Sequence, residues 1–189
     1  MRIGIFGGTF DPPHVGHLLA ASDAVEALAL DRLLIIPAAE QPLKAGIVTA
    51  SAAQRLEMTR RMAGRDPRFE VDPIEIERGG LSFTVDTLRA IRARFAADPG
   101  LALFLLIGAD VLATLPKWRE PEALMTLADL VVLTRDRGGE LPPAVQVLKT
   151  RRVDVSSTEI RARVRDGRSI RAFVPDAVAD YIATERLYR

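Results

Sequence analysis

The 189-residue sequence contains no cysteine and only two histidines, His14 and His17. Without cysteine, the chain can form no disulfide, no thiolate nucleophile and no cysteine-ligated zinc site. Aromatic residues are also few, at 5%, and Trp118 is the only tryptophan. The formal net charge is only +1 at pH 7, which argues against binding to nucleic acid through bulk charge. We therefore expect no nucleic-acid partner.

Long apolar runs are also missing from the sequence. The longest, such as residues 101–109, are too short to span a bilayer, and no basic-then-apolar leader precedes the first strand-like run. We therefore expect a cytoplasmic protein without a membrane partner. Apolar residues make up 48% of the chain and charged residues 27%, as in globular proteins, so we expect one domain over residues 1–189. The choice between a monomer and a homo-oligomer stays open.

Strand-like and helix-like patterns alternate along the chain. Short apolar or alternating runs predict strands at 3–6, 32–37, 69–76, 103–107, 130–134 and 145–148. Amphipathic patterns predict helices at 15–30, 51–63, 82–96, 156–164 and 175–187, with a shorter helix that begins after 108–110 and ends at 115. This order predicts an α/β fold with a doubly wound, mostly parallel sheet covered by helices on both faces. Ligands of such sheets bind beyond the carboxyl ends of the strands, at the topological switch.

The most informative segment is GGTFDPPHVGH, at residues 7–17, which follows the first predicted strand and contains both histidines. Its glycines allow a sharp turn and a close approach of backbone N–H groups to a ligand. A helix is predicted to begin near His14 or Val15, and residues three apart lie on one helix face. His14 and His17 can therefore point at the same ligand. A helix N-terminus beside two imidazoles predicts a binding site for the polyphosphate of a nucleotide triphosphate.

Other interpretations of this segment are weaker. The dinucleotide-binding pattern GxGxxG and the Walker A pattern are both absent from the first turn. The histidines could serve as surface or capping residues, or could approach one metal ion together with Asp11. A zinc site would need further carboxylates or water, because the chain has no third histidine and no cysteine. We favour phosphate binding, and expect no metal bound directly by the protein.

A second candidate phosphate site begins at Ser156, immediately before a helical pattern. Ser156, Ser157 and Thr158 can cap the helix through a hydroxyl, and a helix N-terminus can also bind an anion. Arg161, one turn further on, adds a donor that can bind phosphate in a bidentate manner. Arg135 directly follows a predicted strand and is a weaker candidate for the same phosphates, with a solvated surface charge as the alternative.

These segments resemble those of a known family. Residues 7–17 resemble the signature of the nucleotidyltransferases with the (T/H)xGH motif, and DVSSTEIR at 154–161 is similar to their ISSTxIR segment. SFTVDTL at 82–88, and GAD at 108–110 followed by LPKW at 115–118, are similar to stretches of the bacterial nicotinate-nucleotide adenylyltransferases. The resemblance implies a Rossmann-like nucleotidyltransferase fold. It also implies an enzyme of NAD biosynthesis that transfers AMP from ATP to nicotinate mononucleotide, giving deamido-NAD and pyrophosphate.

Such a transfer requires no covalent bond between the protein and the substrate. The 5′-phosphate of the mononucleotide attacks the α-phosphate of ATP in line and is already an anion at neutral pH. Positioning and charge stabilisation therefore supply the rate, without a general base or a covalent nucleophile. We expect Mg²⁺ as the cofactor, bound through the ATP phosphates and water, where it neutralises the triphosphate and the leaving pyrophosphate.

The resemblance implies that the ATP phosphates lie against both signature segments. His14 and His17 are then the catalytic residues, as hydrogen-bond donors to phosphate oxygens. The implied ATP-binding residues are Gly8, Thr9, His14, His17, Gly108, Arg135, Ser156, Ser157, Thr158 and Arg161.

A second implied set of residues binds the mononucleotide. Trp118 stacks on its pyridine ring in the resemblance, although a packing role is the commoner fate of tryptophan. Thr84 and the adjacent backbone receive the nicotinate carboxylate, and Asp110, which could otherwise cap a helix, lies by the ribose. Phe83 stands where many members of the family have tyrosine, so a hydroxyl contact is lost there. Lys44 contacts phosphate, in a QPLK segment that lacks the histidine of the family's PPHK.

Three alternative functions remain open at this point. One is an adenylyltransferase for the amide mononucleotide or for phosphopantetheine, since the acid and the amide differ by only one charge. Another is a nucleotide-binding regulatory protein without turnover, against which both histidines and the SSTxIR segment argue. A metal-dependent hydrolase is the most distant of the three.

Overall fold

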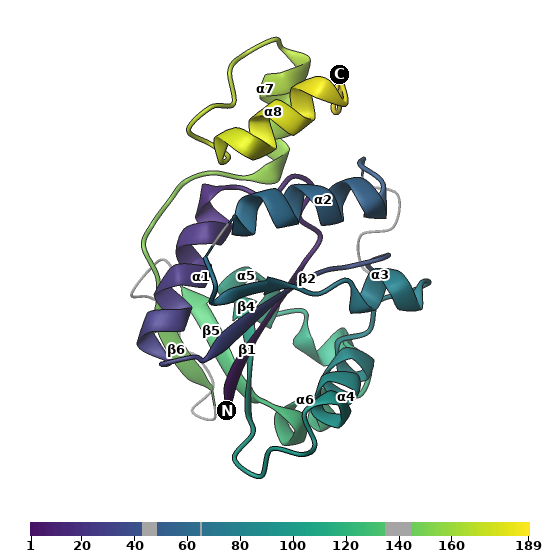
Figure 1. Ribbon diagram of the computed structural model, residues 1–189, viewed down its shortest axis with the longest axis vertical. Helices are drawn as coiled ribbons and strands as arrows, with labels where there is room; N and C mark the ends of the chain where they lie inside the picture. The colour runs from purple at the N-terminus through teal and green to yellow at the C-terminus, as the bar shows by residue number, and fades with distance from the viewer. Residues whose placement is uncertain (43–48, 65, 135–144) are drawn as a thin grey trace.

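The computed structural model describes residues 1–42, 49–64, 66–134 and 145–189 (Figure 1). Within these ranges, six strands form one parallel sheet in the order β3-β2-β1-β4-β5-β6. The strands are β1 (Arg2–Gly8), β2 (Arg32–Pro37), β3 (Phe69–Val71), β4 (Ala102–Gly108), β5 (Asp129–Thr134) and β6 (Gln146–Lys149). The predicted α/β fold with a doubly wound parallel sheet is therefore confirmed.

Helices connect the strands and cover the sheet. They are α1 (Val15–Ala27), α2 (Ala52–Ala63), α3 (Ile74–Arg78), α4 (Thr84–Arg94), α5 (Ala109–Leu112), α6 (Pro121–Leu127), α7 (Ser157–Arg165), α8 (Asp176–Thr184) and the short 3-10 helix η1 (Leu115–Lys117). Among the helices that the structure describes, none is both long enough and apolar enough to cross a membrane.

Alternate residues of each strand point to opposite faces of the sheet and divide the core in two. On one face, Ile3 and Ile5 of β1 pack with α4 and α6. On the other face, Leu33 and Ile35 of β2 pack with α1, α2, α7 and α8. Figure 1 shows these two groups of helices on either side of the sheet. Full burial of one such aliphatic side chain stabilises the fold by about 1.5–3 kcal/mol.

The topology places a ligand-binding crevice at the centre of the sheet. The chain moves outward from β1 through β2 to β3, and then crosses back to β4 on the other side of β1. This strand order is that of the Rossmann fold, in which the order reverses between the first and fourth strands. The crevice therefore opens beyond the carboxyl ends of β1 and β4, at Gly8 and Gly108.

The strand predicted over residues 69–76 is wrong beyond Val71. The carboxylate of Asp72 accepts a hydrogen bond of 3.0 Å from the backbone N–H of Ile74, and Pro73 lies at the N-cap of α3. An aspartate that binds the N–H two residues on, followed by a proline, turns the chain away from the sheet. Alternating glutamate and isoleucine fits one short helix as well as it fits a strand. Helix α6 was not predicted, and the helix predicted to end at 115 is divided into α5 and η1.

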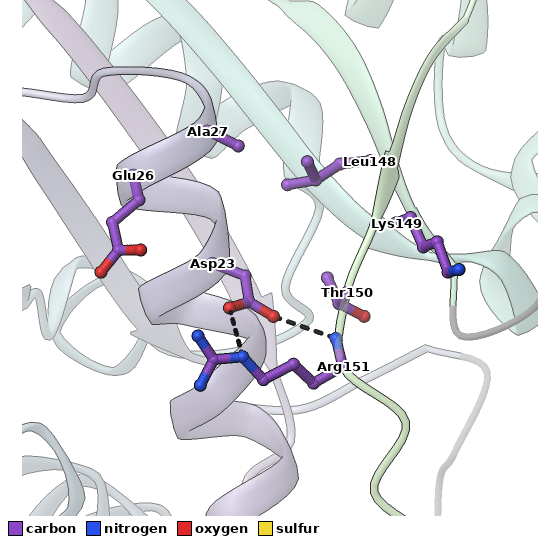
Figure 2. A pocket seen from close by; sticks show the side chains of 7 residues that line it. All are labelled: Asp23, Glu26, Ala27, Leu148, Lys149, Thr150 and Arg151. Atoms are coloured by element: carbon purple, nitrogen blue, oxygen red, sulfur yellow. Dashed lines mark hydrogen bonds and ion pairs between the residues drawn. The ribbon is translucent and has the colours of Figure 1, made fainter.

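Helices α7 and α8 lie together beyond α2, far from the edge strand that precedes them (Figure 1). The apolar side of α8, with Val178 and Ile182, joins the same core cluster as Met58 of α2. The connecting segment is held to α1 by Asp23. Its carboxylate accepts one hydrogen bond of 3.0 Å from the backbone N–H of Arg151 and forms an ion pair with Nε of the same residue at 3.2 Å (Figure 2). This contact guides the chain from β6 along α1 toward the start of α7.

Candidate active site

The turn between β1 and α1 ends at His14, and His17 follows in the first turn of α1. Phe10 has a left-handed backbone with φ 52°, and its ring lies directly over Gly8, where an added Cβ would approach the ring to 2.8 Å. The last position of β1 therefore needs glycine, because a side chain there would displace Phe10. The Phe10 ring meets the rings of Phe6 and His17 edge-on, at centroid distances of 5.8 and 5.1 Å. An aromatic cluster thus supports His17.

The two histidines lie side by side, as the spacing predicted. Their rings stack at a centroid distance of 3.7 Å and an interplanar angle of 30°. His14 is buried and His17 is half-buried. The backbone N–H of His14 donates a 3.2 Å hydrogen bond to Nδ1 of His17. Because Nδ1 accepts this bond, the neutral ring of His17 carries its proton on Nε2, which is then a hydrogen-bond donor.

The N–H groups at the start of α1 are less available than the sequence indicated. The N–H of Val15, the first residue of α1, donates to the carbonyl of Phe173 at 3.0 Å. The backbone N–H of His14 donates its hydrogen bond to the ring of His17. A phosphate at this helix start would therefore be held chiefly by the imidazole rings, rather than by these two backbone groups.

The second signature segment packs against the first. Ser156 is the N-cap of α7, and its hydroxyl accepts the N–H of Glu159 at 3.1 Å, which confirms the predicted cap. Ser157 Oγ donates to the carbonyl of Pro12 at 2.8 Å. Arg161 Nη1 donates to the carbonyl of Asp11 at 2.8 Å. The structure thus brings together the two segments that the resemblance assigns to the ATP phosphates.

Arg161 has a structural contact that the sequence did not indicate. Besides its bond to Asp11, it donates through Nη2 to Thr158 Oγ1 at 3.3 Å. The guanidinium therefore fixes the turn after β1 as well as lying beside the candidate phosphate site. Any phosphate contact would be made by a side chain already held in place, which lowers the entropy cost of binding.

Sequence reasoning considered Asp11 only as a possible metal ligand and missed its hydrogen-bonding role. Its buried carboxylate accepts hydrogen bonds from the N–H groups of Thr49 and Ala50, at 2.8 and 3.1 Å, and from the hydroxyl of Tyr188 at 2.7 Å. These bonds occupy both oxygens. Within the described residues, no three or more His, Asp or Glu side chains are grouped so as to hold a metal ion.

Sequence reasoning missed Arg55 entirely. Its guanidinium is buried beneath the site and donates to four backbone carbonyls, those of Thr9 (2.9 Å), Ala38 (2.6 Å), Ala39 (2.8 Å) and Ala50 (3.3 Å). Burial lowers the pKa of Arg55 and the negative charge of Asp11 opposes that shift. The signal was present in the sequence, because residues 55, 58, 59 and 62 form the buried face of α2. A single arginine on such a face indicates a buried polar network.

Part of the predicted mononucleotide site also comes together in the structure. Phe83 is the N-cap of α4, and the Arg119 guanidinium lies over its ring, 5.0 Å from the centroid. Arg119 also binds Asp86 of α4, with Nη1 3.2 Å from Oδ2. The neighbouring Trp118 is half-buried at the margin of the same core cluster as Phe83, and its Nε1 donates to Thr114 at 3.1 Å. Trp118 therefore lies near the helix that begins at Thr84.

The loop after β2 connects the two parts of the site. Gln41 accepts a 2.8 Å hydrogen bond from the hydroxyl of Thr9, in the turn after β1. Two residues earlier, the N–H of Ala39 donates to Ser82 Oγ at 2.9 Å, and the N–H of Ser82 donates to the carbonyl of Glu40 at 2.8 Å. A change in this loop would thus affect both the turn after β1, through Thr9, and the start of α4, through Ser82.

Asp110 and Gly108 lie at the carboxyl end of β4, beside that of β1. The Asp110 carboxylate bends back over Gly108, so that an added Cβ there would collide with Oδ1. Asp110 is exposed and can meet a ligand in the crevice. Two predicted site residues, Lys44 and Arg135, lie outside the described residues.

One groove of the molecule is separate from this site. It has a volume of about 600 Å³ between α1 and the end of β6 (Figure 2). None of the predicted site residues lines it. Its lining residues are Asp23, Glu26, Ala27, Leu148, Lys149, Thr150 and Arg151.

The fold and the paired signature segments define the class of this protein. Residues 5–163 match the family described as cytidylyltransferase-like. A protein of Gemmatimonas aurantiaca named "Probable nicotinate-nucleotide adenylyltransferase" is 58% identical, with 100% of this chain and 93% of that protein covered. Proteins of the same name from Roseiflexus and Thermus thermophilus are 46% and 48% identical over at least 98% of each chain. The chain therefore belongs to the family of nicotinate-nucleotide adenylyltransferases.

Solved structures show the same fold at much lower identity. Nicotinic acid mononucleotide adenylyltransferase of Plasmodium falciparum, complexed with NaAD, superposes with a TM-score of 0.81 at 16% identity, covering 99% of this chain and 97% of the other. The same enzyme complexed with APC gives a TM-score of 0.79. The expected Rossmann-like nucleotidyltransferase fold is confirmed.

Proposed function

We propose that this protein transfers AMP from ATP to nicotinate mononucleotide, releasing pyrophosphate and forming deamido-NAD. The observation that carries the proposal is the attachment of the start of α7 to the histidine-bearing turn, through Ser157 to Pro12 and Arg161 to Asp11. This attachment places the two family signatures at one end of the sheet. The names of relatives up to 58% identical support the same reaction.

In the proposed mechanism, the triphosphate lies between the start of α1 and the start of α7. His14 and His17 stabilise the charge that develops as the α-phosphate is transferred, and Nε2 of His17 supplies one donor. No proton has to be removed from the attacking phosphate, so two adjacent imidazoles serve as donors rather than as bases. The other proposed ATP-binding residues are Gly8, Thr9, Gly108, Arg135, Ser156, Ser157, Thr158 and Arg161.

The donors of the described site fit a metal that arrives with ATP better than one held by the protein. The described side chains around the turn are imidazole, guanidinium and hydroxyl groups, and the one carboxylate within the turn, Asp11, is already occupied. Mg²⁺ prefers oxygen ligands and keeps several waters. We therefore propose that phosphate oxygens and water hold the ion, which supplies charge neutralisation when bound.

The acceptor is proposed to bind between the start of α4 and the segment that carries Trp118. Trp118 would stack on the pyridine ring, with Phe83 beside it and Asp110 near the ribose. Thr84 and the first backbone N–H groups of α4 would receive the carboxylate, because a helix N-terminus favours an anion. Lys44 is proposed to contact the phosphate of the mononucleotide.

The test is pyrophosphate release from ATP and Mg²⁺ with one acceptor at a time. The acceptors are nicotinate mononucleotide, the amide mononucleotide and phosphopantetheine, and mass spectrometry identifies each product. We expect deamido-NAD as the main product. Equal specificity constants for the acid and the amide would favour the amide-using alternative. If none of the three acceptors gives pyrophosphate release, a regulatory nucleotide-binding protein is favoured. A variant with both His14 and His17 replaced by Ala gives the background rate of pyrophosphate release.

A further inference from the structure

The C-terminal end of the chain contacts the turn that precedes α1 and ends at His14. The Tyr188 hydroxyl donates a 2.7 Å hydrogen bond to Oδ1 of Asp11, a residue 177 positions earlier. We infer that Tyr188 is a positioning residue for catalysis, and this inference depends on the proposed function. Tyr188 acts through Asp11 on the phosphate turn, defined as residues 9–14.

The contact is built into the fold rather than formed by a loose terminus. Tyr188 is only 7% exposed, although it is the second-last residue, and its hydroxyl also lies 3.8 Å from Sδ of Met58. After α8, Arg186 and Tyr188 both adopt left-handed backbone conformations, with φ of 54° and 64°. Such conformations persist in non-glycine residues only where the surrounding structure stabilises them. Burial of the Tyr188 ring in the core cluster with α2 and α8 supplies that stabilisation.

The hydroxyl matters because Asp11 is a buried residue, with 3% of its surface exposed. A buried carboxylate is tolerated only when hydrogen bonds replace its lost hydration. Tyr188 supplies one of the three donors, and it shares Oδ1 with the N–H of Ala50. Burial, and after it the negative charge of Asp11, raise the pKa of Tyr188, so its hydroxyl keeps the proton that it donates. Loss of this donor leaves the carboxylate with only the two backbone N–H groups of the next loop.

The position of Asp11 is transmitted to His17 through one residue. Phe10 immediately precedes Asp11, with its ring held between Gly8 and His17. Arg55 fixes the carbonyl of Thr9 on one side of Phe10, and Tyr188 fixes the carboxylate of Asp11 on the other. A shift of Asp11 therefore rotates the backbone of Phe10, because Arg55 holds the carbonyl of Thr9 on the other side of Phe10. Because the Phe10 ring meets the His17 ring edge-on, that rotation displaces an imidazole of the phosphate site.

The chain offers a matched control for a test of this inference. It has two tyrosines, and the other, Tyr181 on α8, lies beneath the Arg61 guanidinium, 4.7 Å from the ring centroid. Tyr188→Phe and Tyr181→Phe each remove one hydroxyl from the same C-terminal unit. We expect Tyr188→Phe to lower kcat about tenfold while KM for nicotinate mononucleotide changes less than twofold. We expect Tyr181→Phe to stay within twofold of the unmodified protein in both parameters.

A second measurement needs no turnover. Because the chain has only two histidines, NMR can assign both imidazole rings without crowding. In the absence of nucleotide, Tyr188→Phe should shift the His17 ring signals, and Tyr181→Phe should leave them in place. This result stands even if another acceptor proves to be the substrate, so failure of the proposed function can be told apart from failure of this inference.

All comparisons are made well below the lowest Tm in the series. Asp11→Asn serves as a second variant if Tyr188→Phe does not fold, because it replaces one acceptor oxygen of the carboxylate by an NH₂ donor and so disturbs the hydrogen bonds that Asp11 accepts, and it should shift the same His17 signals. Unchanged His17 signals in the folded variants would overturn the inference. It would also be overturned by a kcat for Tyr188→Phe equal to that of Tyr181→Phe, or by equal losses in kcat and in affinity for the mononucleotide.

Discussion

Ser157 and Pro12 are joined by a 2.8 Å hydrogen bond from the serine hydroxyl to the proline carbonyl, across 145 positions of sequence. The bond attaches the first turn of α7 to the turn that ends at His14 and leads into α1, where His17 lies. Arg161 repeats the attachment one turn further along α7, at the carbonyl of Asp11. Two helix starts, those of α1 and α7, are thereby fixed relative to each other. An enzyme that depends on positioning rather than on a nucleophile requires this kind of rigidity.

We predict that His17→Ala lowers turnover far more than it weakens mononucleotide binding. Loss of one preorganised donor to developing charge costs about 2.7–4 kcal/mol, or roughly a hundred- to a thousandfold in kcat. His17→Asn should retain part of the activity, because its amide can still donate. Steady-state kinetics on folded variants provide the measurement, and near-normal kcat in His17→Ala would rule out the phosphate role.

Arg161→Ala should raise KM for ATP and leave KM for the mononucleotide nearly unchanged. The substitution removes a proposed phosphate donor, and it also releases the carbonyl of Asp11. Arg165, an exposed arginine on the same helix, gives the control variant Arg165→Ala, which should behave like the unmodified protein. A fall in Tm with unaltered ATP kinetics would mean that Arg161 acts only as a structural support.

Arg55→Met should destabilise the protein by about 3–5 kcal/mol, because it leaves several buried carbonyls without their charged donor. Its guanidinium holds three segments together through Thr9, Ala38 and Ala50. Arg60→Met is a control on the same helix at an exposed position, and it should change stability by less than about 0.5 kcal/mol. Urea denaturation measures both, and equal midpoints would show that the buried network is not needed for folding.

Local sequence patterns predicted the fold well because hydrophobic periodicity is a local property. The apolar run at 32–37 coincides with β2, and the first predicted strand lies within β1. The same patterns could not separate a strand from a short helix at 74–78, where the deciding interaction is the hydrogen bond that the Asp72 carboxylate accepts from the N–H of Ile74. The contact between Tyr188 and Asp11 was beyond reach, because it depends on how α8 packs on α2.

Thr87→Val should weaken the acceptor site through the orientation of α4. The Thr87 hydroxyl donates to the buried carboxylate of Glu75 at 2.7 Å, which fixes α3 against the first turns of α4. Valine keeps the shape and removes the donor, at a cost of about 1.5–3 kcal/mol for a bond to a charged group. We expect lower stability and a higher KM for the mononucleotide, with ATP little affected. Thr126→Val, on the exposed side of α6, is the control, and matching kinetics in the two variants would exclude this role for Thr87.

We predict that the start of α4 makes the protein prefer the acid mononucleotide over the amide. Helix α4 begins at Thr84 with Phe83 as its N-cap, close to the segment that carries Trp118 and Arg119. The helix dipole favours a carboxylate at such a start by about 0.3–1 kcal/mol when exposed and up to about 2 kcal/mol when partly buried. Hydrogen bonds to a charged group add about 1.5–3 kcal/mol, whereas an amide can turn its own N–H₂ toward the same donors.

These effects together predict a preference for the acid of about a hundredfold or more in kcat/KM, since about 1.4 kcal/mol corresponds to a factor of ten. Trp118→Ala should weaken both acceptors equally, because stacking depends on the ring and not on its substituent. Trp118→Phe, which retains an aromatic ring, should restore part of the binding. Competition between the two mononucleotides gives the ratio directly. A ratio near one in the unmodified protein would assign the acceptor to the amide, and a ratio changed by Trp118→Ala would place the source of selectivity at Trp118 rather than at the start of α4.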